Sequence, residues 1–98
     1  MHEGIVLRQF DFDSQLLRMS TIATSNRGDQ LSIYTKGSPE SMKNIFDSNT
    51  VPSNYEETLK KYTSRGFRVL ALGSRLISKK ELTLSREKLE HKLNFDGF

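Results

Sequence analysis

The sequence contains no cysteine, only two histidines and no long apolar run. The absence of cysteine excludes a disulfide framework and thiolate chemistry, and histidines at positions 2 and 91 alone do not favour a histidine-based metal site. No window approaches the roughly 18 consecutive apolar residues that a membrane-spanning helix requires, so we expect the segment itself to be soluble. Its apolar residues, 35% of the total, gather in short runs, which predicts a folded domain rather than a disordered chain.

An excess of one charge is also nearly absent. Fifteen Lys and Arg residues face twelve Asp and Glu residues, a net charge of +3, and the two signs are mostly interspersed. This balance suits an anionic partner but forms no concentrated basic stripe, so charge alone does not choose between a nucleotide, a nucleic acid and no ligand. Ninety-eight residues suffice for one small domain with one core.

Four self-contained ligand motifs are missing: the P-loop, the Gly-x-Gly-x-x-Gly fingerprint, the Gly-x-Ser-x-Gly elbow and the Asp-rich calcium loop. The segment 65–70 has a superficial likeness to an RNA-binding strand. Arg68 and Val69, however, stand where that strand needs a small residue and a second stacking ring. We therefore do not expect this motif to bind nucleic acid.

The apolar pattern predicts an α/β fold of the α+β kind, with a mostly antiparallel sheet and two principal helices on one face. Two short runs, 5–13 and 16–24, predict strands. The turn residues 26–29 predict a hairpin to a third strand over 30–36. A nearly continuous apolar run, 67–73, predicts a strand buried on both faces, although Arg68 interrupts it.

Two helices are predicted between the third strand and this run. The first begins at a Ser38 cap and extends to about Asp47. The second begins at a capping box over 53–56 and ends at Gly66. A short third helix, capped by Thr83 or Ser85, is predicted near the C-terminal end.

The segment Lys36-Gly37-Ser38-Pro39-Glu40 is the most informative feature of the chain. Glycine lets the backbone approach a ligand closely, and the cap and proline start a helix whose free N–H groups face the same side as the lysine. Alternation along the strand places Lys36 opposite its apolar face. Two interpretations are open: a site that holds an anion, and a surface lysine before an ordinary capped helix.

Phe12 and Arg68 also have two interpretations each. Phe12 is either a core residue or a ring at the rim of the sheet, where stacking on a nucleobase contributes about 1 to 3 kcal/mol. Arg68 has either a carboxylate partner in the protein or a ligand phosphate.

Taken together, Phe12 with Arg18-Met19-Ser20, then 36–40, then Gly66-Phe67-Arg68-Val69-Leu70-Ala71 resemble the nucleotide-binding domain of P-type ATPases. The resemblance runs from about Val6 to Phe98. The phrases at 9–12 and 62–69 look most like type V, subgroup B, pumps of endosomal and lysosomal membranes. It implies that residues 1–98 are a single, partial nucleotide-binding domain whose C-terminal end runs toward the phosphorylation domain.

The resemblance also implies roles for individual residues. Phe12 would stack on adenine, Lys36 and Gly37 would line the pocket for ATP or ADP, and Arg68 would reach the ribose and phosphates. The family often has a basic residue two places before the methionine, where this chain has Leu17. Arg18 is a candidate for the missing contact, although neighbouring strand residues face opposite sides. No metal ligands or catalytic residues are expected within the segment.

For the parent protein the resemblance implies an ATP-driven pump for cations, including polyamines, in an endosomal, lysosomal or vacuolar membrane. This segment would be cytosolic, with the phosphorylation and actuator domains of the same chain as its partners. Mg²⁺ would accompany the nucleotide and be ligated by those other domains. The segment lacks the Asp-Lys-Thr-Gly-Thr phosphorylation sequence and should not turn over alone. The competing hypothesis is a small, basic, non-catalytic module that binds RNA or a protein.

Overall fold

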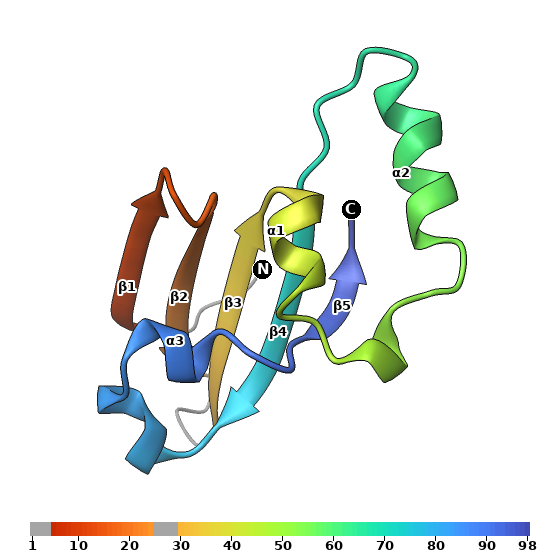
Figure 1. The fold of residues 1–98 in the computed structure, drawn as a ribbon. Coiled ribbons are helices and arrows are strands. Elements are labelled where there is room, and N and C mark those ends of the chain that lie inside the picture. Colours follow the sequence, from red (N-terminus) through yellow and green to blue (C-terminus); the bar gives the residue numbers. More distant parts are fainter. Residues whose placement is uncertain (1–4, 25–29) are drawn as a thin grey trace.

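A five-stranded antiparallel sheet forms the centre of the computed structural model, which describes residues 5–24 and 30–98 (Figure 1). The strands follow one another in space in the order β1-β2-β3-β4-β5. Their bounds are β1 Val6–Asp13, β2 Arg18–Thr24, β3 Leu31–Gly37, β4 Ala71–Ile77 and β5 Asn94–Gly97. The sheet and its short helices confirm the predicted fold class.

Short helices lie between the later strands. They are α1 Pro39–Lys43, the 3₁₀ turn η1 Ser48–Thr50, α2 Tyr55–Thr63, the 3₁₀ turn η2 Lys79–Thr83 and α3 Arg86–Leu89. Figure 1 shows α1 and α3 over the same face of the sheet, while α2 stands beyond the β5 edge. The prediction that the two principal helices share one face is therefore wrong for α2. In the described ranges, no helix is long and apolar enough to cross a membrane.

Alternation along β2 and β3 gives the sheet two different faces. Ile22 and Ile33 are paired across these strands and have no exposed surface. Tyr34, one residue after Ile33, and Met19, three residues before Ile22, point to the opposite side because successive strand residues alternate. We call the side that holds Ile22 and Ile33 the covered face, and the side that holds Met19 and Tyr34 the open face.

The core lies between the covered face and the segments that cross it. Its fully buried members include Met42 of α1 and Leu89 of α3. Near β5 the core continues as an aromatic cluster in which ring centroids are 5.0 to 6.3 Å apart. The cluster consists of Phe46, Tyr55, Phe95 and Phe98.

The structure differs from the prediction in two details of the helices. The first helix spans only Pro39–Lys43, shorter than expected, although Ser38 caps it as predicted. Helix α2 begins after Asn54, which makes no side-chain cap hydrogen bond, so the predicted capping box over 53–56 is wrong. Gly66 follows α2 with φ of +83°, a left-handed conformation that favours glycine.

The prediction of a strand over 67–73 that is buried on both faces is also wrong, since Leu72 within β4 is 42% exposed on the open face. Strand β4 begins at Ala71, and Phe67, Arg68 and Leu70 are exposed. The apolar run therefore mixes an exposed connection with a strand, which an apolar count cannot separate. The predicted turn over 26–29 lies outside the described residues, but the antiparallel pairing of β2 with β3 is confirmed.

Candidate functional site

Lys36 projects from the open face near the C-terminal end of β3. It is paired with Met19 of β2 and Leu72 of β4, which also face that side. These side chains line a hollow of about 310 Å³. Its complete lining is Met19, Thr21, Tyr34, Thr35, Lys36, Leu72, Gly73 and Asp96. A pocket of this size is at the low end for small-molecule sites and suits one part of a ligand.

Gly37, the next residue, lies on the covered face against the end of β2. A Cβ atom at this position would lie 2.5 Å from the carbonyl oxygen of Leu17 and 2.6 Å from Cβ of Arg18. The Leu17 carbonyl also accepts the N–H of Ser38 at 3.0 Å. The glycine thus allows the turn after Lys36 to lie directly on β2.

Ser38 then starts α1. Its hydroxyl accepts the N–H of Ser41 at 3.2 Å, and Pro39 occupies the first helical position. A helix of one turn contributes only a small dipole. Helix α1 also packs on the covered face, whereas Lys36 projects from the open face, so the prediction that the helix N–H groups face the same side as the lysine is wrong. Charge at this corner of the sheet therefore comes mainly from Lys36 rather than from the helix end.

Phe12 and Arg68 lie at the same end of the sheet as Lys36. Pairing places Asp13, Arg18, Gly37 and Ala71 in one row across the first four strands. Phe12 and Lys36 each precede a member of this row by one residue, and Arg68 precedes Ala71 by three. Phe12 is 58% exposed and is thus not a core residue.

The hollow beside Lys36 does not include Phe12 or Arg68. Arg68 lines a second hollow of about 290 Å³, between α2 and the connection that leads to β4. The other residues that line it are Tyr62, Phe67, Val69, Leu70 and Phe98. The structure therefore gathers the predicted residues at one end of the sheet but not in one cavity.

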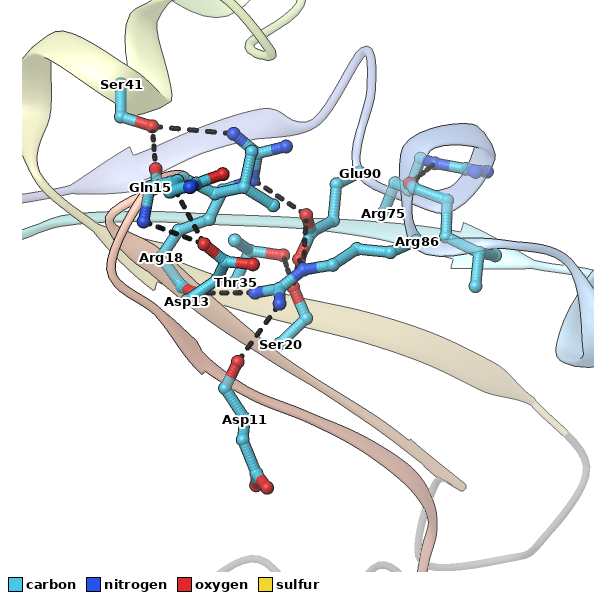
Figure 2. Close-up of polar contacts among 12 residues, drawn as sticks. Asp11, Asp13, Gln15, Arg18, Ser20, Thr35, Ser41, Arg75, Arg86 and Glu90 are labelled. Atoms are coloured by element: carbon cyan, nitrogen blue, oxygen red, sulfur yellow. Dashed lines mark hydrogen bonds and ion pairs between the residues drawn. The ribbon is translucent and has the colours of Figure 1, made fainter.

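Arg18 points to the covered face, away from Lys36, and belongs to a buried ionic cluster (Figure 2). Its Nε donates to Oε1 of Glu90 at 2.7 Å. Arg86 donates from Nε to both carboxylate oxygens of Glu90 at 3.0 Å, and the hydroxyl of Ser20 donates to Oε2. The predicted contact of Arg18 with a nucleotide stays a prediction, and its observed partner is Glu90.

The turn between β1 and β2 is closed by the Asp13 carboxylate. It accepts the N–H of Gln15 at 2.7 Å and that of Leu16 at 3.0 Å. Hydrogen bonds from the backbone of Leu16 and Gln15 lower the pKa of Asp13. Leu17 adopts φ of 57°, a left-handed conformation that is uncommon for leucine. This turn holds the end of β1, where Phe12 lies.

Sequence reasoning missed Glu90, Arg86 and Asp96. Arg86 and Glu90 are four residues apart, the spacing of a helical ion pair, which was a usable signal. The pairing of Glu90 with Arg18 spans 72 positions, and no local pattern reveals it. Asp96 lines the hollow because β5 lies beside β4, which carries Leu72 and Gly73.

Known proteins resemble this chain along nearly all of its length. It is 43% identical over 96 residues to probable cation-transporting ATPase 13A5 of Mus musculus, which covers 94% of this chain and 8% of that protein. Identity is 39% over 97 residues with vacuolar cation-transporting ATPase YPK9 of Saccharomyces cerevisiae, with coverages of 95% and 7%. The chain is 38% identical over 103 residues to polyamine-transporting ATPase 13A3 of Mus musculus, a match that covers 99% of this chain and 8% of that protein. No family model matches the chain.

These matches confirm the family predicted from the sequence: the chain belongs to the P-type ATPases. Within that class it groups with the 13A cation-transporting ATPases, in agreement with the predicted type V assignment. The chain spans less than a tenth of the length of these curated relatives.

Proposed function

We propose that this segment binds ATP or ADP at the end of the sheet that carries Lys36. The observation that carries the proposal is the position of Lys36 in an open-face hollow, within a segment that matches cation-transporting ATPases. An ammonium group on a flexible stem is suited to phosphate oxygens. Met19 and Leu72 supply apolar contact beside it.

Phe12 and Arg68 extend this site to either side of Lys36. The adenine ring stacks on the exposed face of Phe12, and Arg68 contacts the ribose and phosphates. From β1 to β4 is three strand spacings, about 14 Å, a distance that an extended nucleoside triphosphate covers. Gly37 lets the backbone turn closely behind Lys36. Arg18 acts through its contact with Gly37, since its guanidinium is bound to Glu90.

For the whole protein we propose an ATP-driven cation pump, with polyamines among its substrates. One relative is named as polyamine-transporting, which supports this substrate class. Another is named as vacuolar, which supports a membrane of the endosomal, lysosomal or vacuolar system. In this proposal the segment lies on the cytosolic side and positions the nucleotide for the phosphorylation and actuator domains. In this proposal Mg²⁺ bound to the phosphates is ligated by those domains, since Asp96 supplies the single carboxylate among the described residues that line the hollow.

The proposal is tested by titrating the isotope-labelled 98-residue chain with ATP and following its amide NMR signals. We expect shifts near residues 12, 36 and 68, with a dissociation constant near 1 mM, about 4 kcal/mol of binding free energy. Unchanged signals at several times that concentration would refute it. A steep salt dependence of binding to an oligonucleotide, without a response to ATP, would instead support the basic binding module.

A further inference from the structure

The Glu90 carboxylate is the centre of a buried ionic cluster that the proposed site does not itself use. Glu90 is 1% exposed, and its two oxygens receive hydrogen bonds from Arg18, Arg86 and Ser20. Burying these charges carries a desolvation cost, and apolar side chains of similar volume often stabilise a core equally well. What such a cluster contributes beyond stability is a fixed orientation of the side chains that its hydrogen bonds connect.

One branch of the cluster reaches the end of β1. Arg86 donates from Nη1 to the carbonyl oxygen of Asp11 at 3.0 Å and from Nη2 to that of Arg18 at 2.6 Å. Figure 2 shows Arg86 extending between Glu90 and this part of the chain. The first acceptor is adjacent to Phe12. Glu90 therefore orients the side chain that ties the end of β1 to the start of β2.

A second branch reaches the turn after Lys36. Arg18 donates from Nη1 to the hydroxyl of Ser41 at 3.4 Å, and that hydroxyl donates to the carbonyl oxygen of Leu16 at 2.5 Å. Ser41 lies in α1, which begins two residues after Gly37. This branch joins the β1–β2 turn to the segment that follows Lys36.

A third branch lies beneath Lys36 itself. The hydroxyls of Ser20 and Thr35 are 2.6 Å apart, and Ser20 donates to Glu90. Thr35 immediately precedes Lys36 and faces the covered side. The backbone that carries the ammonium group is thereby connected through two hydroxyls to the buried carboxylate.

We propose that Glu90 is a positioning residue for the nucleotide pocket, which fixes the end of β1 against the turn after Lys36. This inference rests on the proposed function, because the pocket that it positions is the proposed ATP site. Glu90 has almost no exposed surface and does not touch the ligand. Its effect on binding acts through Arg18, Arg86 and Ser20.

The test compares Glu90→Gln with Glu81→Gln, which changes the charge equally. Glu81 pairs with Arg75 at 3.0 Å and lies in η2, near the opposite end of β4 from Ala71. We expect Glu90→Gln to raise the dissociation constant for ATP about tenfold in chains shown by NMR to be folded, and Glu81→Gln to change it less than about twofold. Equal effects of both variants, or no effect of Glu90→Gln, would overturn the inference.

A ligand-free readout separates this inference from the proposed function. In Glu90→Gln, hydrogen exchange of the Ser38 amide, which donates to Leu17, should accelerate more than exchange of amides in the centre of β3. Uniform acceleration would mean a general loss of stability and would overturn the positioning role. If the unaltered chain does not bind ATP, the proposed function fails and this exchange pattern alone decides the structural part.

A milder variant covers the case in which Glu90→Gln does not fold. Ser41→Ala removes the link between Arg18 and the Leu16 carbonyl without leaving a buried charge unpaired. We expect it to raise the dissociation constant for ATP about threefold. An unchanged constant would overturn the claim that this branch positions the pocket.

Discussion

Arg18 and Gly37 lie directly opposite each other in the pairing of β2 with β3, and Arg18 occupies the space in which a side chain at position 37 would begin. The same arginine is held by Glu90 on the covered face. It cannot move aside without disturbing a buried ion pair. The glycine is therefore required by packing as well as by any ligand.

The first prediction concerns Gly37→Ala. The added methyl group would contact the Leu17 carbonyl at 2.5 Å, so we expect a loss of about 2 to 4 kcal/mol in the free energy of unfolding. Gly66→Ala is the control, because φ is +83° there but nothing lies within 4 Å of the added atom. It should cost only about 1 kcal/mol. Urea denaturation measures both, and equal losses would contradict the steric argument.

The second prediction concerns the charge of Lys36. Lys36→Met keeps most of the stem and removes the ammonium group from the open-face hollow. We expect ATP affinity to fall about tenfold, the value of one charge-assisted contact. Unfolding free energy should change by less than about 0.5 kcal/mol because the side chain is exposed. Lys79→Met, in η2, removes the same charge elsewhere and should leave ATP affinity unchanged.

The third prediction separates stacking from exposed apolar surface in general. Phe12→Ala should weaken ATP binding by about 1 to 3 kcal/mol while leaving unfolding nearly unchanged. The control is Leu76→Ala, since Leu76 is 65% exposed in the half of β4 farther from Lys36. Isothermal titration at equal salt measures both variants. Weaker binding by the Leu76 variant would argue against a specific role for the phenylalanine ring.

The fourth prediction is a loss of stability at alkaline pH. Burial, with smaller contributions from Glu56 and Glu40, raises the pKa of Tyr55 from 10.0 to about 12. Its hydroxyl also donates to the carbonyl oxygen of Pro39 at 2.8 Å. The unfolded chain loses this proton first, so the stabilisation is complete below pH 10 and declines as pH rises toward 12.

Tyr55→Phe provides the reference for this measurement. It should be less stable by about 1 kcal/mol near pH 8, where the hydroxyl is protonated in both states. Between pH 10 and 12 the free energy of unfolding of this variant should fall by about 2 kcal/mol less than that of the unaltered chain. Parallel stability curves for the two proteins would mean that Tyr55 does not titrate differently on folding.

The fifth prediction concerns acid. Because backbone hydrogen bonds lower the pKa of Asp13 below 3.8, its carboxylate stabilises the fold above that pH and loses this effect as pH falls. Asp13→Asn retains an acceptor oxygen for the Leu16 and Gln15 amides but does not titrate. Thermal melts from pH 6 to 2 should therefore show a shallower acid decline for the variant. An identical decline would contradict this role.

Local sequence patterns were sufficient for the elements that depend on neighbouring residues. The alternation in 31–37 fixes which side Lys36 faces, and a cap with proline at the first helical position starts α1 at Pro39. The family resemblance added the ligand, which no pattern in these residues specifies alone. The matches to cation-transporting ATPases confirm the family, and the nucleotide contacts of the individual residues stay predictions.

Sequence reasoning failed where distant segments determine the environment of a residue. Arg68 was expected inside a buried strand, but it lies with exposed Phe67 and Leu70 in the connection that precedes Ala71. Glu90 directly follows the short helix α3, and it is buried where Arg18 and Arg86 both pair with its carboxylate. The pairing of Glu90 with Arg18 depends on a tertiary contact that neither periodicity nor composition encodes.

The long connection between β3 and β4 has a consequence for how the chain folds. Strands β1 to β3 follow one another closely, whereas β4 pairs with β3 only after residues 38–70 have been traversed. Closing so long a loop costs entropy before any of its ladder hydrogen bonds form. The first three strands should therefore assemble early, and the joining of β4 to β3 should limit the folding rate.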